Sequence, residues 1–62
     1  MFTLSDFLER GFEFMGSSRV ILNVEIYGNK AGERILYDSK KDEVLEIYYI
    51  HSRGGIKQIF PR

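Results

Sequence analysis

Apolar residues near the start of the chain recur at the spacing of a helix. They form one stripe: Leu4, Phe7, Leu8, Gly11, Phe14 and Met15. Steps of three and four residues predict an amphipathic helix over residues 3–15. Thr3 and Asp6 resemble a capping box at its start, and Gly16 offers a left-handed cap at its end.

Further along, apolar and polar residues alternate, which predicts a strand over residues 19–27. The side expected to face the helix carries the even-numbered residues Val20, Leu22, Val24 and Ile26. Residues 28–32 are rich in types that tolerate turns, and a second strand is expected over residues 33–37.

Residues 44–50 are the longest β-prone run, and we expect them to form the central strand. Glu46 marks its solvent side, so alternation divides the other residues between the two faces. Leu45, Ile47 and Tyr49 then face the helix, and Val44, Tyr48 and Ile50 face away. A slip of one residue would invert this assignment. Gly54 and Gly55 predict a turn into a fourth strand, 56–60, which Pro61 ends.

These elements predict one α+β domain spanning residues 1–62. One N-terminal helix packs on a three- to four-stranded antiparallel β-meander, because short connections favour sequential hairpins. A small open barrel is the alternative. With 62 residues and no cysteine, the domain has a small core and no disulfide, so good packing or a partner chain is the expected support.

Nine basic and nine acidic residues give a formal net charge of zero, which does not indicate a general affinity for nucleic acid or anionic membrane. The charge is unevenly spread. Residues 1–18 carry one base against three acids, and residues 51–62 carry three bases and no acid. No apolar run is long enough to span a bilayer, and the N-terminus lacks the pattern of a signal peptide, so a cytoplasmic protein is expected.

The residues offer little to catalysis, and we expect a protein that is not an enzyme and has no cofactor or small-molecule substrate. The one histidine, His51, is followed by Ser52, but neighbours in sequence do not reach the geometry of a nucleophile and base. Asp38, Asp42 and Glu43 lack the spacing of a calcium loop, and the absence of cysteine leaves no zinc set. No metal is expected.

A basic cluster near the C-terminus is the basis for an alternative function. Arg53, Lys57 and Arg62 follow His51 and the two tyrosines of the central strand. Strands that present aromatic rings among basic residues can stack bases, so the alternative is a small nucleic-acid-binding protein.

The predicted sheet has more apolar residues than one helix can cover. The face away from the helix, called the far face below, is expected to carry Ile21, Tyr27, Val44, Tyr48 and Ile50, with Glu25 and Glu46 among them. A contiguous apolar face with tyrosines favours binding of another protein or of a second copy, and strand 56–60 adds an edge for strand addition. The residues predicted to bind the partner are Tyr27, Glu46 and Tyr48 on that face, with Arg53 and Lys57 at its rim.

The short acidic helix Leu4-Ser5-Asp6-Phe7-Leu8-Glu9, followed by β-hairpins in a small cysteine-free chain, resembles the small inhibitor proteins of phages. Some anti-CRISPR proteins share this helix-then-strands order. The resemblance implies a stoichiometric inhibitor or regulator that docks on a host nuclease or polymerase. Such proteins often imitate DNA with dense acid, whereas this chain has no net charge.

Overall fold

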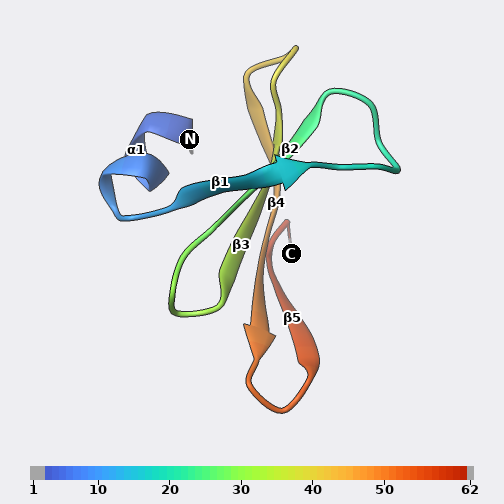
Figure 1. Cartoon of the computed structure of the whole chain (residues 1–62). Helices are drawn as coiled ribbons and strands as arrows, with labels where there is room; N and C mark the ends of the chain where they lie inside the picture. The colour runs from blue at the N-terminus through green and yellow to red at the C-terminus, as the bar shows by residue number, and fades with distance from the viewer. Residues whose placement is uncertain (1–2, 62) are drawn as a thin grey trace.

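The computed structural model describes residues 3–61 and shows one short helix followed by five strands. The elements are α1 (Leu4–Glu9), β1 (Glu13–Ser17), β2 (Val24–Gly28), β3 (Glu33–Asp38), β4 (Glu43–His51) and β5 (Gly55–Phe60). The strands pair antiparallel in the order β1-β2-β3-β4-β5, so that β1 and β5 are the edges of an open sheet (Figure 1). The α+β class and the meander are confirmed, with five strands in place of three or four.

The helix is half as long as predicted, because a glycine cap stops it. Gly11 has a φ of 94°, and its N–H donates to the carbonyl of Leu8 at 3.2 Å. The N–H of Phe12 donates to the carbonyl of Phe7 at 3.1 Å, and the two rings meet edge to face at 5.2 Å. Together these are a Schellman motif with its apolar contact. The prediction of a helix over 3–15 is wrong beyond Glu9; the Thr3 cap is confirmed by its bond from the N–H of Asp6.

The rest of the predicted helix is the unpredicted strand β1. Phe14 pairs with Tyr27 and Gly16 with Ile26, with a bulge between the two pairs. Gly16 has a φ of 137° and lies inside β1, so it does not cap a helix. The residues Phe14 and Met15 are each 56% exposed.

Strand β2 starts five residues later than predicted. Asn23 has a φ of 65°, and residues 18–23 form a loop between β1 and β2. The prediction that Val20 and Leu22 are buried under the helix is therefore wrong: they are 92% and 85% exposed. The prediction of a strand over 19–27 holds for residues 24–27, and the strand continues one residue further, to Gly28.

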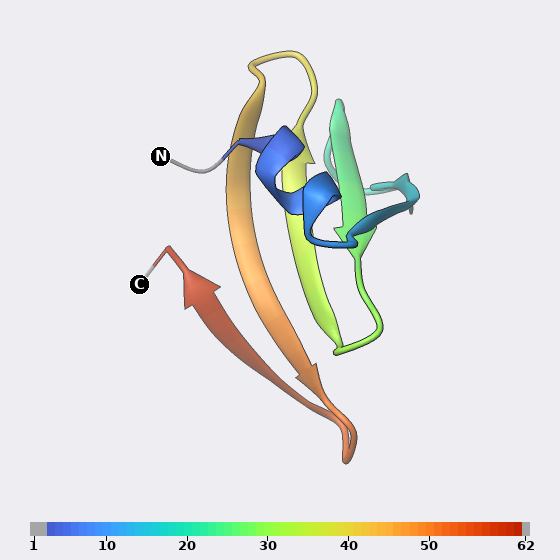
Figure 2. The same cartoon turned by 90° about the vertical axis from the view of Figure 1, so that its left-hand side faces the viewer.

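The core lies between α1 and one face of the sheet, which we call the helix face (Figure 2). Its buried cluster is Phe7, Phe12, Tyr27, Ile35, Tyr37, Val44 and Ile47. In β2 the odd-numbered residues face α1, and the even-numbered residues do not, which inverts the prediction for this strand. Tyr27 pairs with Ile35, and Glu25 pairs with Tyr37, so these four residues share the helix face.

A bulge explains the second inversion. Tyr37 pairs with Val44 and Leu36 pairs with Glu46, so Leu45 is an extra residue in β4. The bulge turns Val44 to the helix face, where it is 6% exposed, contrary to the prediction. Beyond the bulge the predicted alternation holds: Ile47 faces the core, and Glu46 and Tyr48 lie on the far face.

Candidate protein-binding surface

The five residues predicted to bind a partner do not form one site. Tyr27 is 8% exposed in the core, which contradicts its predicted place on the far face. Its hydroxyl donates to Oε1 of Glu25 at 3.0 Å. Burial, then this hydrogen bond and the carboxylate charge of Glu25, raise the pKa of Tyr27.

The other four predicted residues are divided among three places. Glu46 and Tyr48 lie on the far face and are half-buried. Arg53 is exposed in the turn between β4 and β5. Lys57 pairs with Tyr49, which places it on the face opposite to Tyr48 and corrects its predicted place at the rim of the far face.

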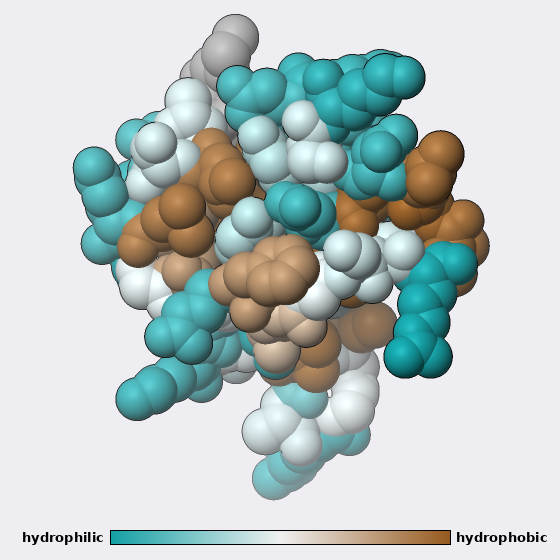
Figure 3. Space-filling model, turned by 45° about the horizontal axis from the view of Figure 1, so that its top comes forward, coloured by the Kyte–Doolittle hydropathy of each residue, from teal (hydrophilic) through white to brown (hydrophobic). Residues whose placement is uncertain are grey.

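Three neighbouring apolar residues in the loop of residues 18–23 are exposed, and two of them are the most exposed large hydrophobic residues among residues 3–61. Val20 is 92%, Ile21 49% and Leu22 85% exposed. Figure 1 shows this loop projecting from the sheet on the side away from α1, and Figure 3 shows apolar surface at the same margin. We call these three residues the apolar tip. Consecutive exposed apolar residues in a fold are unusual unless they bind something.

Hydrogen bonds hold the backbone of this tip in place. The hydroxyl oxygen of Ser18 accepts from the N–H groups of Val20 and Ile21, at 3.2 and 3.1 Å. The N–H of Ser18 donates to the carbonyl of Val24 at 2.7 Å. The N–H and the hydroxyl of Ser39 donate to the carbonyl of Asn23, at 2.9 and 3.1 Å. The loop therefore presents its side chains on a backbone fixed at both ends.

The apolar tip continues an apolar strand. Nine large hydrophobic residues are exposed among residues 3–61, and five of them are Phe14, Met15, Val20, Ile21 and Leu22. We call these five residues the apolar edge. They lie on β1, whose one sheet neighbour among residues 3–61 is β2, and on the loop that follows it. One segment thus combines an unpaired strand edge with an apolar tip.

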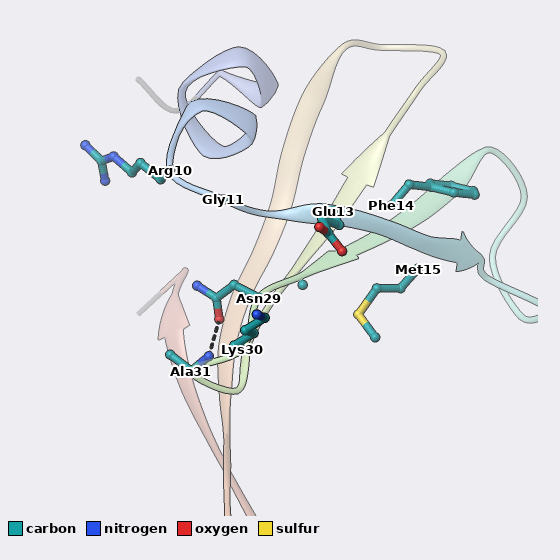
Figure 4. A pocket seen from close by; sticks show the side chains of 9 residues that line it. Arg10, Gly11, Glu13, Phe14, Met15, Asn29, Lys30 and Ala31 are labelled. Atoms are coloured by element: carbon teal, nitrogen blue, oxygen red, sulfur yellow. Dashed lines mark hydrogen bonds between the residues drawn. The ribbon is translucent and has the colours of Figure 1, made fainter.

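A hollow of about 740 Å³ lies at the other end of β1 (Figure 4). It is lined by Arg10, Gly11, Glu13, Phe14, Met15, Gly28, Asn29, Lys30 and Ala31. Met15 points from β1 toward the turn of residues 29–31, and Arg10 points away from it. Oδ1 of Asn29 accepts from the N–H groups of Ala31 and Glu33, both at 3.1 Å, which fixes that turn.

Two features are absent from the described residues, a group of side chains suited to a metal ion and a helix suited to crossing a membrane. Residues 3–61 contain no cluster of three or more histidine, cysteine or acidic side chains. Over the same residues, no helix has the length and apolarity needed to cross a membrane. His51 contacts the ring of Tyr49 edge to face at 4.8 Å, at the exposed end of β4.

The prediction missed the apolar edge for two reasons. The helical period placed Phe14 and Met15 in the helix, and alternation placed Val20 and Leu22 in a strand beneath that helix. The signal that identifies the loop is the pair Ser17-Ser18 where it starts and Asn23 where it ends. These residue types favour turns and bonds to their own backbone. No family model matches the chain, and no curated protein or solved structure matches it either.

Proposed function

We propose that this protein is a non-enzymatic protein-binding module and that the apolar edge is its binding surface. The single observation that carries the proposal is the exposure of Val20, Ile21 and Leu22 on a hydrogen-bonded backbone. Full burial of such side chains is worth about 1.5–3 kcal/mol each, which the free domain leaves unused at this loop.

The fixed backbone of the loop favours binding of a partner. Because Ser18 already holds the N–H groups of Val20 and Ile21, a partner orders little of this loop when it binds. Preordered loops bind more tightly since less conformational entropy is lost. The neighbouring edge of β1 adds main-chain groups that a partner strand can pair with.

A photoreactive amino acid at position 22 tests this proposal. We expect ultraviolet cross-linking in cell extract to join the chain to a protein, either another copy or a different protein. The matched control is the same photoreactive residue at Ile56, which is 72% exposed on the opposite edge strand. Absence of protein cross-links at position 22, or equal cross-linking at position 56, contradicts the proposal.

A second candidate function rests on one face of the β4–β5 hairpin. Lys57 pairs with Tyr49, whose ring meets His51, and Arg53 is exposed at the hairpin turn. Aromatic and basic side chains on one strand face suit a single-stranded nucleic acid. Arg62, also predicted to belong to this cluster, lies outside the described residues.

Salt dependence distinguishes this second candidate. Nucleic-acid binding by this face should weaken steeply as salt rises, and Lys57→Gln should lower the salt slope by about one. Binding that is absent, or unaffected by salt, removes the candidate. The inhibitor role implied by the phage resemblance, with a host protein as target, stays a prediction.

A further inference from the structure

We infer that the partner of the apolar edge is a second copy of this chain, bound by antiparallel pairing of β1 strands about a twofold axis. This inference rests on the proposed function and names its partner. A twofold contact is self-complementary and closes at two copies, whereas joining β1 to β5 leaves free edges that can add further copies.

The two ends of β1 carry features that fit one another. The hollow lies at its start and the apolar tip beyond its end, and Figure 1 shows the chain continuing past β1 into the loop. With Met15 on the axis, Ser17 of one copy lies opposite Glu13 of the other. Antiparallel pairing then places the loop that follows β1 in one copy toward the start of β1 in the other, which is where the hollow lies.

One pair of opposite charges, Arg19 and Glu13, supports this register. Arg19 precedes the tip and follows the end of β1 by two residues, and antiparallel pairing places that end beside Glu13, the first residue of the other copy's β1. Glu13 is exposed at the rim of the hollow. The hollow also holds Arg10 and Lys30, so the attraction comes from one pair and not from a general field. Such pairs contribute to register and specificity.

The opposite edge fits self-pairing less well. Lys57 lies near the middle of β5, so that pairing two β5 strands brings two lysines close together. Lysine in an exposed edge strand is a common protection against strand addition. Strand β1 carries no lysine or arginine.

The bulge in β1 limits the backbone pairing. A bulge between Phe14 and Gly16 interrupts the ladder, so only a few interstrand hydrogen bonds can form across the axis. Most of the contact area then comes from the two apolar tips and the two hollows. Dimer formation would also support a domain whose own core is small.

Sedimentation velocity of the purified chain over a range of concentrations tests the inference. The wild type should pass from monomer to dimer. Leu22→Asp should raise the dimer dissociation constant about a hundredfold, since each dimer loses two buried leucines. Ile56→Asp, an equally drastic change at another exposed apolar residue, should leave it unchanged. A wild type that stays monomeric, or a control variant that dissociates equally, overturns the inference.

A charge exchange tests the register. Arg19→Glu and Glu13→Arg should each weaken the dimer about tenfold, and the double variant should recover most of the loss. A double variant no stronger than the weaker single variant overturns this pairing. If the purified chain is monomeric while position 22 still cross-links to a different protein in extract, the dimer fails and the protein-binding function stands. If neither occurs, both fail.

Discussion

Leu22 and Val24 are two residues apart and similar in character, yet Leu22 is 85% exposed and Val24 is 1% exposed. Val24 begins β2, where its backbone pairs with β3. Leu22 belongs to a loop whose bonds run to Ser18 and Ser39. Hydrophobicity alone does not bury a residue; the backbone must also direct its side chain toward other packed residues, as β2 does for Val24 and the loop does not for Leu22.

The same contrast holds for whole regions. The helix face is closed by Phe7 and Phe12, and Ile35 at its centre is 0% exposed. The apolar edge has no such cover within the described residues. The helix face holds the domain together, and we propose that the apolar edge binds a partner. The variants below test that division.

The largest effect is expected at the centre of the closed region. Ile35→Ala should destabilise the domain by about 2–5 kcal/mol, because it removes a buried side chain and leaves a cavity. Chemical denaturation followed by circular dichroism measures the change. If this variant does not fold, Ile35→Val should still cost about 0.5–1.5 kcal/mol. A value near zero would mean that Ile35 is not at the core.

The next effect is a dependence of folding stability on pH, which comes from two tyrosines of the helix face. The hydrogen bond to the Asp42 carboxylate, together with burial, raises the pKa of Tyr37 to about 12 from 10.0. The unfolded chain therefore loses this proton first, so stability is full below about pH 10 and falls as pH rises from 10 to 12. The raised pKa of Tyr27 acts in the same direction.

Tyr37→Phe should make the fall in stability above pH 10 less steep, since only Tyr27 then contributes a raised pKa. Denaturation midpoints measured between pH 8 and 12 show the slope. Leu22→Asp is the control and should keep the wild-type slope. Identical slopes for wild type and Tyr37→Phe would contradict the proposed bond to Asp42.

A smaller effect is expected at the backbone of the apolar tip. Ser18→Ala removes the oxygen that accepts from the N–H groups of Val20 and Ile21, and should cost about 0.5–1.5 kcal/mol. Amide hydrogen exchange should become faster at these two residues and stay unchanged at Ile35. Unchanged exchange at the tip would show that Ser18 does not hold the loop.

The smallest effect on stability is expected at the tip itself. Leu22→Asp should change the free energy of unfolding of the monomer by less than about 0.5 kcal/mol, as for most exposed sites. Denaturation at concentrations below those of any dimer gives this value. A loss as large as that of Ile35→Ala would place Leu22 in the core.

The sequence predicts whether a segment forms a helix or a strand better than it predicts the residues at which that element begins and ends. Strand β4 is recognisable because most of its residues are β-branched or aromatic, and Thr3 marks the start of α1. The sequence also carries a signal for the end of α1, because Gly11 lies between Phe7 and Phe12 at the spacing of a Schellman motif. The helical period of apolar residues continues past Gly11 to Met15, and this conflicting signal predicts a longer helix.

Two features lie beyond sequence periodicity. The extra residue Leu45 in β4 follows from how β3 pairs with β4, which no local pattern fixes, and it reverses the face of Val44. The apolar tip depends on long-range bonds from Ser39 to Asn23. The sequence predicts an exposed apolar surface on the far face. In the structure Glu46 and Tyr48 on that face are half-buried, and the most exposed apolar residues lie on the apolar edge.

Methyl NMR with a soluble paramagnetic agent, over a range of protein concentrations, tests the central claim most directly. At low concentration the methyl groups of Val20 and Leu22 should relax as strongly as those of Ile56, and those of Ile35 should be protected. As concentration rises, Val20 and Leu22 should become protected while Ile56 does not change. Protection of Val20 and Leu22 at the lowest concentration, equal to that of Ile35, would contradict the claim that the apolar tip is open in the single chain.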